Sequence, residues 1–224
     1  MTGREVDVTC IGLATPHGAR AATWNSAKWG QRLKMRSISP HPFDFPPRLR
    51  LPAGNPDSAF REALSDAGMM PGDCIEVPII VGSSKGGVGR IGSPSLNGGF
   101  WNEVPAHAIG EELARSTGWG GPVRTVSAAC ASGALAVGLA ASAVAHGETD
   151  VAIAGGVEED LSPLLLAGYE RLGVLSPDGV CRPFDRRRSG FVPSAGAGFI
   201  VLESAERAAR RGARVYATMA GWAA

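Results

Sequence analysis

The sequence predicts an α/β domain with a largely parallel sheet. Short β-branched apolar runs that end in glycine or polar residues recur along the chain, and helix-like stretches lie between them. Of the 224 residues, 44% are apolar, which is enough for a well-buried core. Alternating strands and helices favour parallel strands, because parallel neighbours need a crossover connection between them.

Six strands are predicted from the apolar runs: Val6–Gly12, Val77–Gly82, Val123–Val126, Val151–Ala154, Phe199–Leu202 and Val215–Ala220. We expect Phe199–Leu202, which follows a long loop, to run antiparallel at an edge of the sheet. The first and last predicted strands share a pattern of β-branched residues followed by glycine and small residues. This weak internal repeat suggests that a second copy of the α/β unit begins near the last strand.

The helix signals are caps and breakers. Pro56 takes the first position of one helix and Gly68 ends it, and Ser204 caps a last helix that ends at Gly212. Two further helices are predicted at Val104–Thr117 and Ser132–His146. Loops are predicted at Arg36–Asn55, which is rich in proline, and at Ser83–Gly99, as either a mobile binding loop or a wide turn.

Composition excludes several function classes. The formal net charge is +1, so there is no global attraction to nucleic acid or to a membrane surface. The four cysteines have no C-x-x-C spacing, which favours a reducing compartment and no metal site. The first residues show no secretory leader, so we expect a cytoplasmic protein. The uncharged run Ala128–Ala145 is shorter than the roughly 20 residues of a membrane span and predicts a helix buried in protein.

Cys130 is the strongest candidate for chemistry. The strand Val123–Val126 leads into a turn of small residues, and the uncharged helix follows. This order places the thiol near a helix N-terminus, where free N–H groups and the helix dipole stabilise a thiolate. The residues alone also allow a buried, inert structural cysteine. In either case the helix lacks a polar face, which implies a second layer beyond it.

Several segments resemble the β-ketoacyl synthases in order and spacing. They are Ser127–Gly133, Asp150–Gly156, Leu175–Ser176, Cys181–Asp185, Ser189–Val192, Gly196–Glu203 and Arg211–Ala213, with Gly12–Gly18 similar to the opening of that family. The resemblance covers nearly the whole chain. It implies the thiolase-like fold: two similar halves, each a five-stranded mixed sheet with helices, stacked with the nucleophile's helix in the central layer. Residues 1–212 would be the N-terminal domain, and residues 213–224 the start of the second half.

The resemblance also implies a function in fatty acid or polyketide biosynthesis. Cys130 would accept an acyl group from acyl carrier protein or acyl-CoA as a thioester, and its backbone N–H would be one oxyanion donor. The family's two catalytic histidines, its lysine and its gating loop belong to the second half, so we expect this chain alone to be incomplete for condensation. No cofactor or metal is implied. Partners would be a second copy, paired through Val123–Val126, or a complementary C-terminal half.

Two features separate this chain from the family pattern. Ser194–Gly198 reads Ser-Ala-Gly-Ala-Gly where the family usually has Gly-Glu-Gly-Ala-Gly. The four histidines, His17, His41, His107 and His146, lie where surface or capping roles are expected, and none fills a catalytic place. A second hypothesis therefore stays open: a non-catalytic ketosynthase-like subunit that binds a partner chain or acyl carrier protein.

Three other patterns carry less weight. Gly82–Gly86 fits G-x-S-x-G, but a nucleophile elbow must open a helix and more glycines follow here. Gly87–Gly92 fits G-x-G-x-x-G without a following helix to face a pyrophosphate. Arg186–Arg188 is either a solvated charge run or an attraction for an acidic carrier protein or for the phosphates of CoA. Structural roles are expected for Cys10, Cys74 and Cys181.

Overall fold

The computed structural model describes residues 3–14, 36–37, 49–50, 56–70, 76–91, 99–159 and 162–223. Its centre is a six-stranded mixed sheet with the order β5-β4-β6-β7-β1-β8. The strands are β1 (Val6–Ala14), β4 (Ile79–Gly82), β5 (Val123–Val126), β6 (Val151–Glu158), β7 (Gly196–Ser204) and β8 (Ala217–Thr218). β4 runs parallel to β5 and β6, whereas β7 is antiparallel to β6 and to β1. The predicted α/β class is confirmed, and so is the mixed sheet that the family resemblance implies. The largely parallel sheet expected from alternating strands and helices is wrong, because β1 pairs antiparallel with both of its neighbours and β6 pairs antiparallel with β7.

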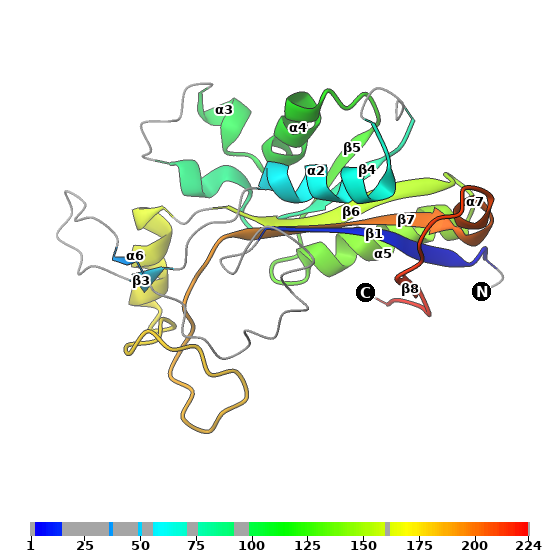
Figure 1. The fold of residues 1–224 in the computed structure, drawn as a ribbon. Coiled ribbons are helices and arrows are strands. Elements are labelled where there is room, and N and C mark those ends of the chain that lie inside the picture. Colours follow the sequence, from blue (N-terminus) through cyan, green and yellow to red (C-terminus); the bar gives the residue numbers. More distant parts are fainter. Residues whose placement is uncertain are drawn as a thin grey trace.

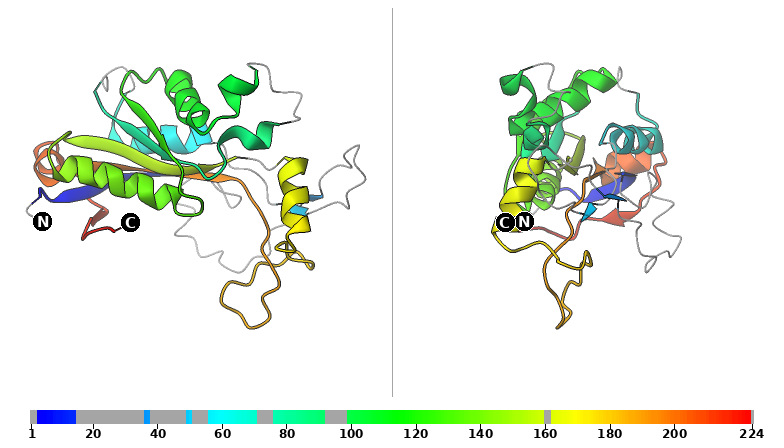
Figure 2. Two further views of the ribbon diagram at one scale, coloured as in Figure 1. Left: turned by 180° about the vertical axis from the view of Figure 1, so that it is seen from behind. Right: turned by 90° about the vertical axis from the view of Figure 1, so that its left-hand side faces the viewer.

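Helices cover both faces of the sheet (Figure 1). α2 (Pro56–Ala67) and α4 (Ala106–Thr117) lie on one face, and α5 (Ser132–Ala145) lies on the other, as the rear view also shows (Figure 2). The remaining elements are the 3-10 helix η2 (Gly86–Arg90), α3 (Phe100–Glu103), α6 (Pro163–Arg171), α7 (Ala205–Arg210) and a small pair of strands, β2 (Arg36–Ser37) and β3 (Leu49–Arg50). No helix among the described residues is long and apolar enough to cross a membrane.

The face under α2 is packed around aromatic rings. Phe60 on α2 makes edge-to-face contacts with Trp119 and with Phe199 on β7, at centroid distances of 5.7 and 5.3 Å. The Trp119 indole donates a hydrogen bond of 3.0 Å to the carbonyl oxygen of Val77, so its polar atom is satisfied inside the core. These contacts hold α2 on one face of the sheet and tie Trp119 to the segment that leads into β4.

The opposite face is covered by small residues. Ala136, Ala140, Ala141 and Val144 of α5 are buried against residues of the sheet that include Ile80. Alanine lets the helix axis come close to the strands. Leu139 points away from the sheet and is 37% exposed, so the second covering layer that the uncharged helix predicts is not among the described residues.

Three further topological expectations need correction. β7 is antiparallel as predicted, but it is central, between β6 and β1, because its register pairs Ile200 with both Ala154 and Ile11. Arg36–Asn55 was expected to be loop, yet residues at its start and near its end pair as β2 and β3; its other residues lie outside the described ranges. β8 pairs with β1 in the same sheet, so the sheet has one strand more than the five that the family resemblance implies.

Candidate functional site

Three parallel strands end at one edge of the sheet, and polar residues follow each of them. Gly82 at the end of β4 is level with Val126 of β5 and with Gly156 of β6. Beyond these positions come Cys130 after β5, Ser83–Lys85 after β4, and Glu158 at the end of β6. The carboxyl edge of parallel strands is where ligands usually bind in open α/β sheets.

Cys130 lies in a tight turn between β5 and α5. The N–H of Ala131 donates to the carbonyl oxygen of Ala128 at 3.0 Å, and the N–H of Ser132 donates to that of Ala129 at 3.2 Å. Ala129 has a φ of 48°, in the left-handed region that residues with a side chain rarely adopt. Cys130 is exposed and lies two residues before the first residue of α5, so the burial that the structural alternative expected is not observed.

Ser132 ties this turn together. Its hydroxyl accepts a 2.9 Å hydrogen bond from the N–H of Ala128 and donates a 2.6 Å hydrogen bond to the carbonyl oxygen of Ala129. The residue is 3% exposed. Sequence reasoning did not single out Ser132, although a serine at the start of a helix was the available signal.

Glycines let the backbone of this turn rest on the strand ends. A Cβ on Gly82 would lie 2.2 Å from the carbonyl oxygen of Ser132, and one on Gly133 would lie 3.4 Å from the Cα of Gly156. The start of α5 therefore contacts β4 and β6 backbone to backbone. This explains the small residues that flank Cys130 in the sequence.

A cluster of charged side chains lies at the same ends of β4 and β6, next to the start of α5. Ser84 donates a 2.6 Å hydrogen bond to the Glu158 carboxylate, and the Lys85 ammonium lies 2.9 Å from Ser84 and 2.5 Å from Glu158. Beside it, Arg90 pairs with Glu159 and Glu112. The hydrogen bond to Glu159, which outweighs the effect of burial, raises the pKa of Arg90. Sequence reasoning missed the Lys85–Glu158 pair because it depends on strand register.

The two glycine motifs set aside from the sequence have structural explanations. The Ser84 hydroxyl is held by Glu158, and a 3-10 helix follows it in place of the α-helix of a nucleophile elbow. Gly87 lies in that 3-10 helix, where a Cβ would meet the carbonyl oxygen of Glu103 at 1.9 Å. Gly87 is thus needed for packing between η2 and the α3–α4 connection.

An apolar cavity of about 410 Å³ begins one helical turn beyond Cys130. Its walls come from α5, β6, β7 and the last described residues: Gly133, Ala134, Val137, Gly138, Ala154, Gly155, Gly156, Gly198, Ile200, Met219 and Trp222. No charged side chain of the described residues lines it. Trp222 packs so closely on Gly138 that a Cβ there would lie 2.3 Å from its ring.

Cys10, His107 and His146 are described by the structure, and none of them belongs to this turn. Cys10 is buried in β1, and burial raises the pKa of its thiol, as befits a structural residue. His107 is exposed on α4, and His146 caps the far end of α5 with its Nδ1 2.8 Å from the carbonyl oxygen of Ser142. His17, His41 and Cys74 lie outside the described residues. Among the described residues, no three His, Cys, Asp or Glu side chains are grouped so that they could hold a metal ion.

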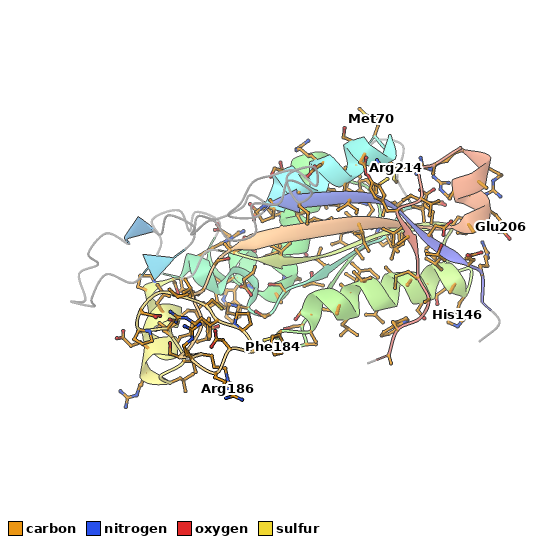
Figure 3. All side chains as sticks on the ribbon, turned by 60° about the horizontal axis from the view of Figure 1, so that its bottom comes forward. Met70, His146, Phe184, Arg186, Glu206 and Arg214 are labelled. Carbon is orange, nitrogen blue, oxygen red and sulfur yellow. The ribbon has the colours of Figure 1, made fainter. Side chains whose placement is uncertain are left out.

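The arginine run lies on a loop after α6. Arg186, Arg187 and Arg188 are exposed, and Arg187 pairs with Asp185. Phe184 on the same loop is fully exposed with a φ of 63°. Figure 3 shows Phe184 and Arg186 at the end of the molecule that carries α6, away from His146 at the far end of α5. Cys181, also exposed, lies on this loop.

Comparison with known proteins gives a consistent result. The family model "Beta-ketoacyl synthase, N-terminal domain" matches residues 57–208. A polyketide beta-ketoacyl synthase 1 from Streptomyces halstedii is 33% identical over an alignment that covers 98% of this chain and 63% of the relative. A 3-oxoacyl-acyl-carrier-protein synthase 2 from Rhizobium meliloti is 35% identical over 71% of this chain and 42% of the relative. The chain thus spans less than two thirds of the length of these relatives.

Solved structures agree. The ishigamide ketosynthase/chain length factor superposes with a TM-score of 0.79 at 26% identity, over 98% of this chain and 63% of that chain. A type II polyketide acyl-carrier protein in complex with its ketosynthase bound to the hexaketide gives a TM-score of 0.74 at 25% identity, over 98% of this chain and 62% of that chain. The thiolase-like architecture expected from the sequence is the architecture of these neighbours.

Proposed function

Because this chain belongs to the β-ketoacyl synthase family, we propose that it is a ketosynthase-type acyltransferase unit of polyketide or fatty acid biosynthesis. Cys130 is the proposed acyl acceptor. The observation that carries the proposal is the exposed thiol of Cys130 in a strained turn that leads into α5. Residues 1–212 are the proposed N-terminal domain, and residues 213–224 begin the second half.

The proposed reaction is acyl transfer between thioesters. The Cys130 thiolate attacks the carbonyl carbon of an acyl thioester, and the carbonyl oxygen gains the negative charge. The N–H of Cys130 donates one hydrogen bond to this oxyanion. When the carbonyl re-forms, the thiolate of the donor leaves, and the acyl group stays on Sγ of Cys130. Acyl-CoA and acyl carrier protein both fit as donors, since both carry acyl groups as thioesters.

Condensation needs further groups. In the described part of the chain, His146 lies at the opposite end of α5 from Cys130, roughly 20 Å away along a helix of 14 residues. His107 lies on α4, across the sheet from α5. We propose that condensation takes place in an assembly in which other residues complete the site. β5 is an edge strand of the sheet, and this supports pairing with a second copy there.

A second function is supported by one comparison. The ishigamide ketosynthase/chain length factor structure indicates that chains of this architecture include a chain length factor. A non-catalytic subunit that binds a partner chain or carrier protein would not need an acylated cysteine.

The release of free CoA distinguishes the two functions. An acyltransferase mixed with excess medium-chain acyl-CoA should release a burst of one CoA thiol per chain, and Cys130→Ala should release none. If the folded protein gives no burst with acyl-CoA or with acyl carrier protein as donor, while it still binds the carrier protein, the subunit function replaces the acyltransferase function.

A further inference from the structure

We propose that Ser132 is a positioning residue, whose buried hydroxyl holds the strained turn that presents Cys130. The inference rests on the proposed role of Cys130 as acyl acceptor. Ser132 does not touch the reacting atoms in this account. It acts through the backbone of Ala128 and Ala129, with which its hydroxyl makes two hydrogen bonds.

Ala129 is the strained residue in the turn. At a φ of 48° its Cβ crowds the backbone, so an alanine left to itself would prefer another conformation. Strain of this kind persists only where the surroundings determine the conformation. The 2.6 Å hydrogen bond from Ser132 to the carbonyl oxygen of Ala129 supplies such a constraint at the strained residue itself.

The second hydrogen bond fixes the entrance of the same turn. The N–H of Ala128 donates to the Ser132 hydroxyl at 2.9 Å, so a single buried oxygen bridges the residues on the N-terminal side of Cys130. Because Ser132 is 3% exposed, water cannot readily replace the hydroxyl. Removing the Ser132 hydroxyl would leave the N–H of Ala128 without its hydrogen-bond acceptor.

The backbone of Ser132 is itself held in place by contact with the end of β4. The space between its backbone and Gly82 is too small for a Cβ, so the first turn of α5 cannot sink toward β4. The backbone that carries the Ser132 hydroxyl is therefore held in one position. A rigid strand end, a buried hydroxyl and a strained alanine form a chain of contacts that ends at Cys130.

This chain of contacts predicts an effect on acyl transfer more than on binding. If the turn relaxes, the Cys130 thiol moves relative to a bound acyl carbonyl, and small displacements of a nucleophile cost much of its rate. Donor binding, which depends on other surfaces, should change little. The expected signature of losing the hydroxyl is a lower maximal rate with an unchanged KM for the donor.

Four variants of the full chain test the inference: Ser132→Ala, Ala129→Gly, the double variant, and Ser142→Ala as the matched control. Ser142 is on the same helix, and its hydroxyl contacts His146 at the far end. We expect Ser132→Ala to slow acylation of Cys130 by about tenfold or more at an unchanged donor KM. Glycine adopts a positive φ without strain, so Ala129→Gly should restore most of the rate in the double variant. Ser142→Ala should match the wild type.

Either of two kinetic results would overturn the inference: wild-type acylation by Ser132→Ala, or a double variant as slow as Ser132→Ala although it unfolds at the wild-type temperature. The 13Cα chemical shift of Ala129, which reports its φ, adds a readout that does not need acylation. A left-handed Ala129 in Ser132→Ala would also contradict the role of Ser132. If the wild-type chain accepts no acyl group, the proposed function fails, and the shift of Ala129 still decides whether Ser132 holds the turn.

Discussion

Gly82 and Ser132 meet backbone to backbone, and a Cβ on Gly82 would stand 2.2 Å from the carbonyl oxygen of Ser132. α5 therefore begins in direct backbone contact with the end of β4. Because Cys130 lies only two residues before α5, the position of its thiol depends on how closely this strand and this helix approach each other.

A methyl group at Gly82 should push the start of α5 away from the end of β4. Gly82→Ala is expected to lower the free energy of unfolding by about 1–3 kcal/mol and to slow acylation of Cys130, because backbone atoms on both sides must shift. Urea unfolding and acylation rates measure the two effects. Gly168→Ala is the control, since it lies in α6 with no atom near the added methyl and should be neutral or slightly stabilising. Equal stability of the two variants would contradict this packing.

The buried Glu203 carboxylate should make the protein sensitive to acid. Burial tends to raise the pKa of Glu203, but hydrogen bonds from Arg211 and Thr9 outweigh burial and hold it below its ordinary value of 4.5. The stabilising contribution is complete above that ordinary value and is lost as pH falls through the lower folded-state pKa. Glu203→Gln should cost about 3 kcal/mol at pH 7 and flatten the loss of stability in acid. An acid profile as steep as that of the wild type would refute the assignment.

The Lys85–Glu158 ion pair should contribute to stability together with Ser84. Ser84 donates a hydrogen bond to Glu158, and Lys85 contacts both residues, so Glu158→Gln and Lys85→Met should each lower the free energy of unfolding. We expect a coupling energy of about 1 kcal/mol in the double-mutant cycle, because both side chains are partly buried. Urea unfolding of the four proteins measures it. Additive effects of the two substitutions would show that the pair is not coupled.

Association through β5 should depend on its free edge. The N–H of Ser83 on the β4 side donates to the carbonyl oxygen of Val126, so alternation turns the N–H of Thr125 to the opposite side of β5. Proline is tolerated on edge strands but cannot donate a hydrogen bond. If copies pair here, Thr125→Pro should shift sedimentation from dimer to monomer while the fold is kept. A dimer of unchanged stability would place the interface elsewhere.

Local signals made most of the fold predictable. β5 was predicted with its observed bounds, Val123–Val126, because a β-branched run ends at small residues. α6 was missed despite the cap Ser162 and the first-turn proline Pro163, because its three consecutive leucines do not form an apolar stripe and only Leu166 is buried. The central place of β7 depends on pairing with strands far away in the sequence, which no local pattern reports.

The site was predictable in part. Small residues before an uncharged helix pointed to Cys130, but they left open whether its thiol is reactive or a buried structural cysteine. The exposure of the thiol appears only in the folded chain, and alanine gives no sign of the left-handed φ observed at Ala129. The ion pair of Lys85 with Glu158 depends on the register of β4 with β6, which appears only in the folded sheet.

The most direct test of the acyl-acceptor role is the intact mass of the protein after incubation with a medium-chain acyl-CoA. Cys130→Ala and Cys181→Ala are the paired controls, since both cysteines are exposed and only Cys130 precedes a helix. We predict a single acyl adduct on the wild type and on Cys181→Ala, and none on Cys130→Ala. An adduct that persists in Cys130→Ala, or no adduct on any folded form with either acyl-CoA or acyl carrier protein as donor, would contradict the account.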